Sequence, residues 1–351
     1  MIAKRNGYID VIKLLLAIIV AEFHLGSGLF PGGRLAVDGF FMITGYLMMR
    51  SIESDKGQDR IGVSTVKFLY RKYKALLPIL IVSAIIGFSV HCVIRNFSFG
   101  EAMENLPLLI FDIFPMQATG MKGVYVLGIS WYLSSMFIAL AVLYPFIKKF
   151  GQGFSLVACP LIALVFYGIL SAKYGHIAVG AMFLENSIIH TGWLRAIAGC
   201  SMGCLIYEIT KRARGVEFTR LARVIFTIAE SALLVFILYM MHYYPKGIHN
   251  YVVVFAIFGM LIIGIGGFSY TSKLWNPKWT KYMGLASTLL VLNHYCWAKL
   301  LLYKLSHLGK TETILAFIGL SALACIVTHL VSQLLVFLMG KIFKKKYFVK
   351  Q

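Results

Sequence analysis

Apolar runs close to the length of a membrane-crossing helix recur along the whole chain, separated by short polar or basic connections. A helix needs about 20 predominantly apolar residues to cross a bilayer. The pattern predicts an all-α, polytopic membrane protein that forms a single domain over residues 1–351. We expect ten transmembrane helices, at residues 8–29, 35–51, 70–94, 126–147, 154–172, 190–208, 222–243, 251–269, 284–304 and 312–339.

The stretch 102–121 is apolar but is interrupted by Pro107, Asp112 and Pro115. Irregular backbone cannot face lipid, because its unpaired peptide groups would have no hydrogen-bonding partners there. We therefore expect this stretch to be a loop on the outer face or a re-entrant segment buried in protein. An additional crossing here would also reverse the orientation of every later loop.

The positions of the basic residues predict the orientation of the chain. Loops on the cytoplasmic side of a membrane protein carry an excess of Lys and Arg. With the N-terminus inside, most of the 34 Lys and Arg residues fall at the inner ends of the ten expected helices. Both termini are therefore predicted to lie in the cytoplasm, and the basic inner face is expected to meet membrane lipid head groups.

Composition supports a membrane protein and argues against two other classes. Hydrophobic residues make up 59% of the chain and charged residues 14%, which is too little polar surface for a water-soluble globule. The net charge of +20 could suggest a nucleic-acid partner, but the charges lie between apolar segments rather than on a soluble basic face. We expect no nucleic-acid binding.

All six cysteines fall within or at the edge of apolar segments, so a disulfide framework is not expected. Cys200 and Cys204 are one helical turn apart, but no further Cys or His nearby completes a tetrahedral set. We interpret these two small side chains as helix-packing residues and expect no metal site.

Two ionisable residues of the first helix, Lys13 and His24, are candidates for chemistry because such groups are costly inside a membrane. They are eleven residues apart, so they lie on one face of the helix and about 16 Å apart along its axis. The alternatives are that Lys13 extends its ammonium group to the membrane surface and that His24 is a structural histidine bonded to backbone.

Further candidates occur on later helices, each with an ordinary structural alternative. Asp38 could orient His24 or be a surface carboxylate. Arg71 and Lys74 share a helix face and could bind phosphate or only enforce topology. Arg195 and His294 could line a substrate site or form buried structural bonds, and Trp131 could stack on a sugar or anchor the membrane interface.

Three segments together resemble acyltransferase family 3, the bacterial membrane enzymes that acylate sugars of surface polysaccharides. The family's first helix has Arg or Lys, ten residues and then His, as in Lys13 and His24. Its Phe-Phe-x-x-Ser-Gly pattern is matched by residues 40–45, with Thr44 in place of Ser. Its Arg-x-x-Arg pattern is matched by Arg71 and Lys74, and Lys lacks the planar fork for bidentate phosphate binding.

The resemblance implies an O-acyltransferase of the bacterial cytoplasmic membrane that transfers an acyl group, usually acetyl from acetyl-CoA, to a hydroxyl of a surface glycan or of its lipid-linked precursor. Lys13, Arg71 and Lys74 would hold the donor, and Trp131, Arg195 and His294 would line the acceptor site. His24 would act as the base, with Asp38 orienting it, or would accept the acyl group itself.

Two other classes also fit a chain of this kind. A transporter or flippase of a lipid-linked sugar would have many helices and a few buried charges, but it should also show related halves with broken helices in corresponding positions, and we find no such pairing. A membrane sensor or assembly scaffold is compatible with the composition.

Overall fold

The computed structural model describes residues 5–55, 57 and 59–348, and the side chains of all of these except 273 and 339–348. Each of the ten predicted ranges overlaps one long helix. These helices are α1 (Gly7–Leu25), α2 (Ala36–Ser54), α3 (Ile61–Arg95), α6 (Ser130–Gly153), α7 (Cys159–Tyr174), α8 (Thr191–Arg212), α9 (Arg220–Tyr243), α10 (Asn250–Gly266), α12 (Pro277–Lys304) and α13 (Lys310–Phe348).

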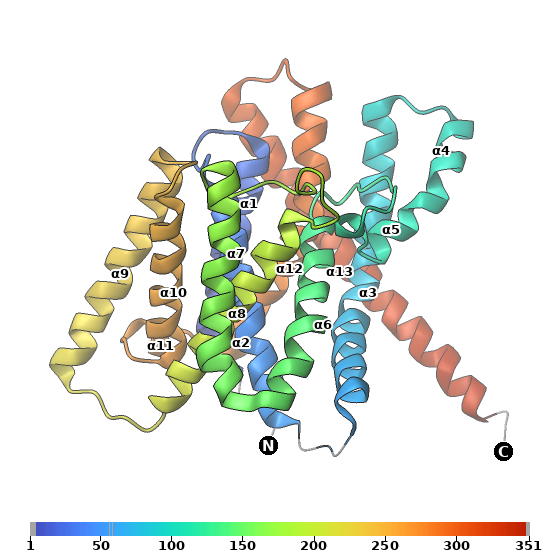
Figure 1. The fold of residues 1–351 in the computed structure, drawn as a ribbon. Helices are drawn as coiled ribbons and strands as arrows, with labels where there is room; N and C mark the ends of the chain where they lie inside the picture. Colours follow the sequence, from blue (N-terminus) through green and yellow to red (C-terminus); the bar gives the residue numbers. More distant parts are fainter. Residues whose placement is uncertain (1–4, 56, 58, 349–351) are drawn as a thin grey trace.

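Short helices connect the long ones: η1 (Gly33–Leu35), α4 (Phe99–Asn105), η2 (Leu106–Leu109), α5 (Ile110–Ile113), η3 (Gln117–Thr119), the π-helical turn η4 (Phe154–Ala158) and α11 (Thr271–Leu274). Figure 1 shows α9 and α10 at one side of the bundle and α3, α4 and α5 at the other.

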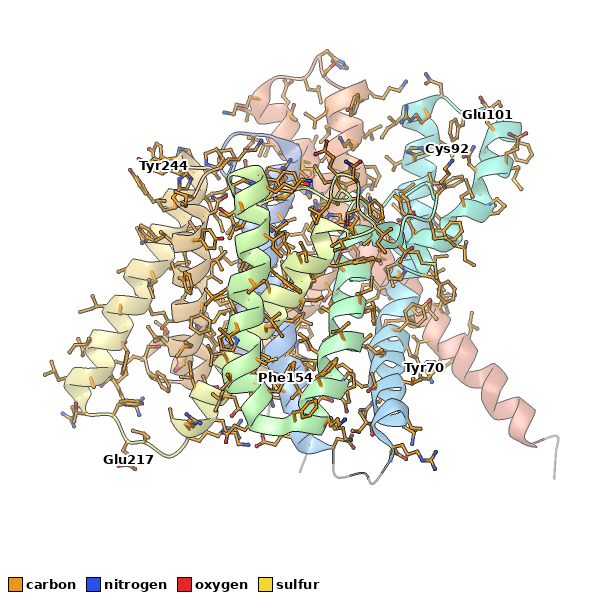
Figure 2. All side chains as sticks on the ribbon, viewed as in Figure 1. Tyr70, Cys92, Glu101, Phe154, Glu217 and Tyr244 are labelled. Carbon is orange, nitrogen blue, oxygen red and sulfur yellow. The ribbon has the colours of Figure 1, made fainter. Side chains whose placement is uncertain are left out.

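Six helical stretches of the described chain are long and apolar enough to cross a membrane: 33–54, 61–95, 130–174, 220–243, 277–304 and 310–338. The chain is therefore a helical membrane protein. The charged residues Glu101 and Glu217 lie towards opposite ends of the helical bundle (Figure 2). Figure 1 shows α1 beginning and α13 ending at the same end of the bundle. The count of ten crossings and the side on which the termini lie remain predictions.

The largest differences from the predicted helices are the end of α13, at Phe348 rather than at residue 339, and the start of α3, at Ile61 rather than at residue 70. Its first turns bury Ser64, Thr65 and Phe68 and expose most of the residues between them. These turns are amphipathic rather than apolar all round, so an apolar run does not reveal them. The stretch 102–121 is broken into α4, η2, α5 and η3, as an irregular segment requires.

Small residues allow the central helices to approach closely. A side chain at Gly45 of α2 would lie 2.0 Å from the carbonyl oxygen of Cys200, and one at Gly203 of α8 would lie 2.0 Å from that of Met42. Small residues at such positions permit close helix contact in lipid. Cys200 belongs to this packed seam, as the sequence predicts, and α2 is thereby fixed against α8.

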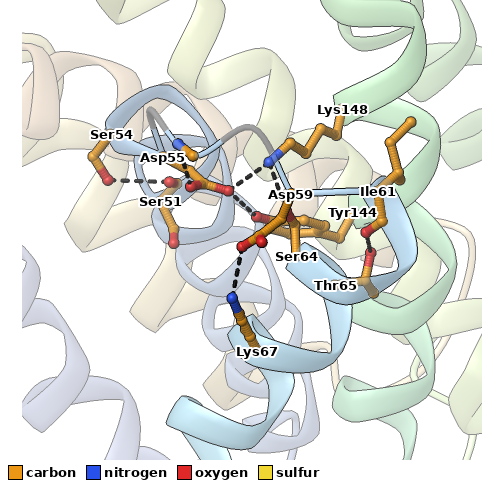
Figure 3. A network of polar contacts seen from close by, with 11 residues as sticks. Ser51, Ser54, Asp55, Asp59, Ile61, Ser64, Thr65, Lys67, Tyr144 and Lys148 are labelled. Carbon is orange, nitrogen blue, oxygen red and sulfur yellow. Dashed lines mark hydrogen bonds and ion pairs between the residues drawn. The ribbon is translucent and has the colours of Figure 1, made fainter.

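A polar network ties the α2–α3 connection to α6 (Figure 3), at the end of the bundle where α1 begins (Figure 1). Lys148 Nζ is 2.5 Å from a carboxylate oxygen of Asp55 and donates to Ser64 Oγ at 2.9 Å, and the Tyr144 hydroxyl donates to Asp55. The bond from Lys148 lowers the pKa of the Asp55 carboxyl. Because this network holds the start of α3 in place, it also positions Lys72 one helical turn beyond Phe68.

Candidate active site

The last turn of α1 places His24 at a cavity among α1, α2, α6 and α12. Its ring is half-buried, and its Nδ1 lies 2.9 Å from Nε2 of His294 on α12. His294 is fully buried, and its Nδ1 lies 2.9 Å from the carbonyl oxygen of Leu290. Two helices 270 residues apart in sequence thus bring the two imidazoles together.

The hydrogen bonds determine which nitrogen of each ring carries a proton. A carbonyl oxygen only accepts, so Nδ1 of His294 donates to Leu290. A fully buried imidazole with no carboxylate among its described partners is neutral, so Nε2 of His294 has a lone pair and accepts from Nδ1–H of His24. His24 shares its cavity with Arg34, Arg195 and Lys299, and these cations disfavour a further positive charge there. Its ring is therefore neutral as well, and its Nε2 is unprotonated, as a general base requires.

The outer cavity, as we call the space beside His24, has a volume of about 430 Å³. It is polar and aromatic rather than purely apolar, which suits a ligand with several hydroxyl groups. Its ring-bearing and charged lining residues are Phe23, His24, Arg34, Phe40, Trp131, Tyr132, Arg195, Tyr295 and Lys299. Trp131 and Arg195, predicted from the sequence, lie in this cavity, whereas His294 supports His24 from behind it.

Asp38 is placed differently from the role predicted for it. Its carboxylate is fully buried and lies 2.5 Å from Nη2 of Arg195, and it accepts from the Tyr167 hydroxyl at 3.0 Å. Among the described contacts, the side-chain partner of His24 is therefore His294 and not Asp38. Asp38 instead holds Arg195, whose guanidinium also donates to the carbonyl oxygen of Val179 at 2.9 Å and lies 5.7 Å from the Trp131 ring centre.

An inner cavity of about 260 Å³ lies on the other side of a shared wall and contains Lys13 and Lys72. Arg71 and Lys74, the predicted donor-binding residues of α3, are exposed and do not line it. The reason is helical phase: position 72 continues the stripe through Phe68, which faces the bundle, whereas 71 and 74 point away from it. Lys72 is thus a candidate that the sequence reasoning missed.

The shared wall consists of four residues that line both cavities: Phe40, Ile129, Tyr132 and Val291. We call this set the partition. The Tyr132 ring packs against Phe40 and Phe41, with ring centres 6.1 and 4.9 Å apart. Lys13 and His24, predicted to share one face of α1, therefore lie on opposite sides of one layer of side chains.

The sequence reasoning also missed Arg34, Tyr295 and Lys299, which line the outer cavity. Arg34 lies in η1, one residue before the predicted range 35–51, and so gave no signal as an intramembrane charge. Lys299 lies five residues after His294, close enough to the helix end to be taken for an interfacial anchor. Among the described residues, no group of three or more His, Cys, Asp or Glu could hold a metal.

The fold and this site define a helical membrane protein with a paired, neutral histidine at a polar cavity. The acyltransferase family 3 model, described as an acyltransferase domain, matches residues 6–336. The chain belongs to this family, and acyl transfer is the general reaction that membership supports. Comparison with curated proteins and with solved structures gave no match.

Proposed function

We propose that the chain transfers an acetyl group from acetyl-CoA to a hydroxyl of a cell-surface glycan or its lipid-linked precursor, at the bacterial cytoplasmic membrane. The observation that carries the proposal is the bond between His24 and His294, which leaves Nε2 of His24 free at the outer cavity. Family membership supports the acyl transfer itself, and the histidine supplies the base that it needs.

In the proposed reaction, Nε2 of His24 removes the proton of the acceptor hydroxyl as its oxygen attacks the thioester carbonyl. The C–S bond breaks, the CoA thiolate leaves, and the proton on His24 passes to that sulfur. One ester and one thiol are formed, and His24 returns to its starting state. In the covalent alternative, His24 carries the acetyl group between donor and acceptor.

The inner cavity supports binding of the donor arm from the cytoplasmic side. Its volume of about 260 Å³ is smaller than that of most small-ligand pockets, roughly 300–1,000 Å³, so it suits the slender pantetheine arm better than the nucleotide. The nucleotide stays at the surface, where the exposed Arg71 and Lys74 offer positive charge to its phosphates. Lys13 and Lys72 line the route inward.

For the thioester to meet the acceptor, the donor arm must pass the partition of Phe40, Ile129, Tyr132 and Val291. A closed partition keeps water from connecting the two cavities, and this protects a reactive thioester from hydrolysis. We therefore propose that the arm displaces Tyr132, whose ring stands between the inner lysines and the outer histidine.

The test uses purified protein in detergent, radiolabelled acetyl-CoA and a panel of glycans. His24→Ala should lower acyl transfer by at least about a hundredfold, the lower range for loss of a general base. His24→Gln keeps hydrogen-bonding capacity without basicity and should be equally inactive. His307→Gln is the matched control, because His307 is exposed beyond α12. Near-normal transfer by folded His24→Gln protein would refute the mechanism.

A further inference from the structure

A second cavity adjoins the outer cavity between α3, α12 and the segment 124–126. It has a volume of about 490 Å³. Its wall includes Tyr295 and Lys299, which also line the outer cavity, and the Tyr295 ring centre lies 5.3 Å from that of His24. We call this space the side pocket. A ligand that fills the side pocket is therefore separated from His24 only by the Tyr295 ring.

The side pocket gathers positive charge that is not neutralised. Arg95, Lys299 and Lys304 line it together with His91, and its lining contains no Asp or Glu. Among the residues that the structure describes, none of these four has an ion-pair partner. Lys304 donates to the neutral side-chain oxygen of Asn96 at 2.7 Å.

Tyrosine rings also line the side pocket, beside its cations. Lys299 Nζ lies 5.5 Å from the Tyr295 ring centre and 5.2 Å from that of Tyr303, close enough for cation–π attraction. Tyr125 lines the pocket from the opposite segment. These contacts hold Lys299 in place between the two cavities without lowering its net charge.

Converging cations without an acid repel one another, and an anionic ligand relieves that repulsion. Arg95 and Lys304 are the last residues of α3 and α12, and both helices end away from the end of the bundle where α1 begins (Figure 1). This is the side predicted to be outside, where Lys and Arg are normally scarce. Three cations from two helices can each bond to a different oxygen of a phosphate, whereas a single carboxylate offers only two oxygens.

We propose that the side pocket binds a phosphate group of the acceptor, so that the substrate class is a phosphorylated glycan or a lipid-linked sugar phosphate. This inference rests on the proposed function for the reacting hydroxyl, which would lie in the outer cavity beside His24. Lys299, shared by both cavities, fixes the distance between the phosphate and that hydroxyl.

The experiment measures binding to the full chain in detergent, separately from catalysis. The probes are N-acetylglucosamine, N-acetylglucosamine 1-phosphate and farnesyl diphospho-N-acetylglucosamine. The phosphorylated sugar should bind at least about tenfold more tightly than the neutral one, since charged hydrogen bonds are the stronger class. Its affinity should fall as salt rises. Still tighter binding of the farnesyl probe than of N-acetylglucosamine 1-phosphate would identify a lipid-linked source, and equal binding of the two phosphorylated probes a phosphate within the glycan.

The variant is Arg95→Gln combined with Lys304→Gln, both exposed residues whose replacement should leave the fold intact. It should abolish the preference for phosphate, whereas Lys310→Gln, an exposed cation at the start of α13 that does not line the pocket, should preserve it. Equal affinity for neutral and phosphorylated sugars, or an unchanged preference in the double variant, would overturn the proposal.

Two further outcomes separate this proposal from the proposed function. If adenosine 3′,5′-bisphosphate competes with the sugar phosphate, the pocket holds the donor nucleotide and the acceptor assignment is wrong. If the double variant loses phosphate binding while His24→Gln keeps full acyl transfer, the pocket assignment stands and the role of His24 fails. If His24→Gln is inactive but the phosphorylated sugar binds no more tightly than the neutral one, the role of His24 stands and the pocket assignment fails.

Discussion

Replacing His294 tests whether this buried residue sets the protonation of His24. His294→Phe keeps a ring of similar shape but removes Nε2, the acceptor 2.9 Å from Nδ1 of His24. His24 then loses the bond that keeps the proton on Nδ1, so its free nitrogen no longer points reliably to the outer cavity. His294→Gln restores an acceptor oxygen on a flexible chain.

The magnitude follows from the hydrogen bond that is lost. Leaving a buried donor without its acceptor costs about 1–3 kcal/mol. If that cost must be met each time His24 adopts the reactive arrangement, the barrier rises by the same amount and the rate falls by a factor of about 5 to 160. The expected loss is in kcat, with KM for the acceptor nearly unchanged, because His294 does not line the outer cavity.

The assay is the initial rate of acetyl transfer at saturating acetyl-CoA, with folding checked by size-exclusion elution and thermal stability. His294→Gln should recover most of the loss, and His307→Phe, a change at an exposed histidine, should have no effect. A well-folded His294→Phe protein with wild-type kcat would refute the argument that this bond selects the reactive form of His24.

Three other predictions concern the rest of the chain. Lys72→Gln should raise KM for acetyl-CoA about tenfold through loss of one charged contact, whereas Lys149→Gln, at an exposed position, should leave KM unchanged. Equal KM values for the two variants would remove Lys72 from the donor route. Asp38→Ala should destabilise the protein by about 3–5 kcal/mol, seen as a lower unfolding temperature, because its buried arginine partner is left uncompensated. A cytoplasm-dependent reporter should work after Lys211 and fail after Lys246, and activity at Lys246 would contradict the predicted orientation.

The helices could be predicted from the sequence because burial in lipid demands long apolar runs. The limits of α1 and α9 differ from prediction by at most four residues, as helix ends usually do, whereas α13 runs nine residues past its predicted end. The nine-residue error at α3 has another cause, since its first turns are amphipathic and bury only one stripe. A long apolar run identifies the part of a helix that lies in lipid. It does not identify amphipathic turns that extend the same helix beyond the apolar run.

Pairing between helices could not be read from the sequence. Spacing along α1 puts Lys13 and His24 on one side of the helix, because helical phase is a local property. The side-chain partner of His24 lies on α12 and the ion-pair partner of Asp38 lies on α8, and no periodicity within a helix specifies which neighbour it meets. Ionisable residues could be recognised as candidates, but their contacts depend on the packing of the whole bundle.

The assignment of Asp38 shows how two buried charges constrain a third group. Arg195 is 1% exposed and requires a counter-charge, so the carboxylate of Asp38 is committed to it. The other carboxylate near His24 in sequence, Glu22, accepts the backbone N–H groups of Leu29 and Phe30 at 2.8 and 2.6 Å. With both acids occupied, a neutral histidine is the partner left for His24, and it can be buried without a counter-ion. The site therefore orients the proposed base through a neutral hydrogen bond, and on this proposal the identity of the residue at position 294 matters for rate rather than for charge balance.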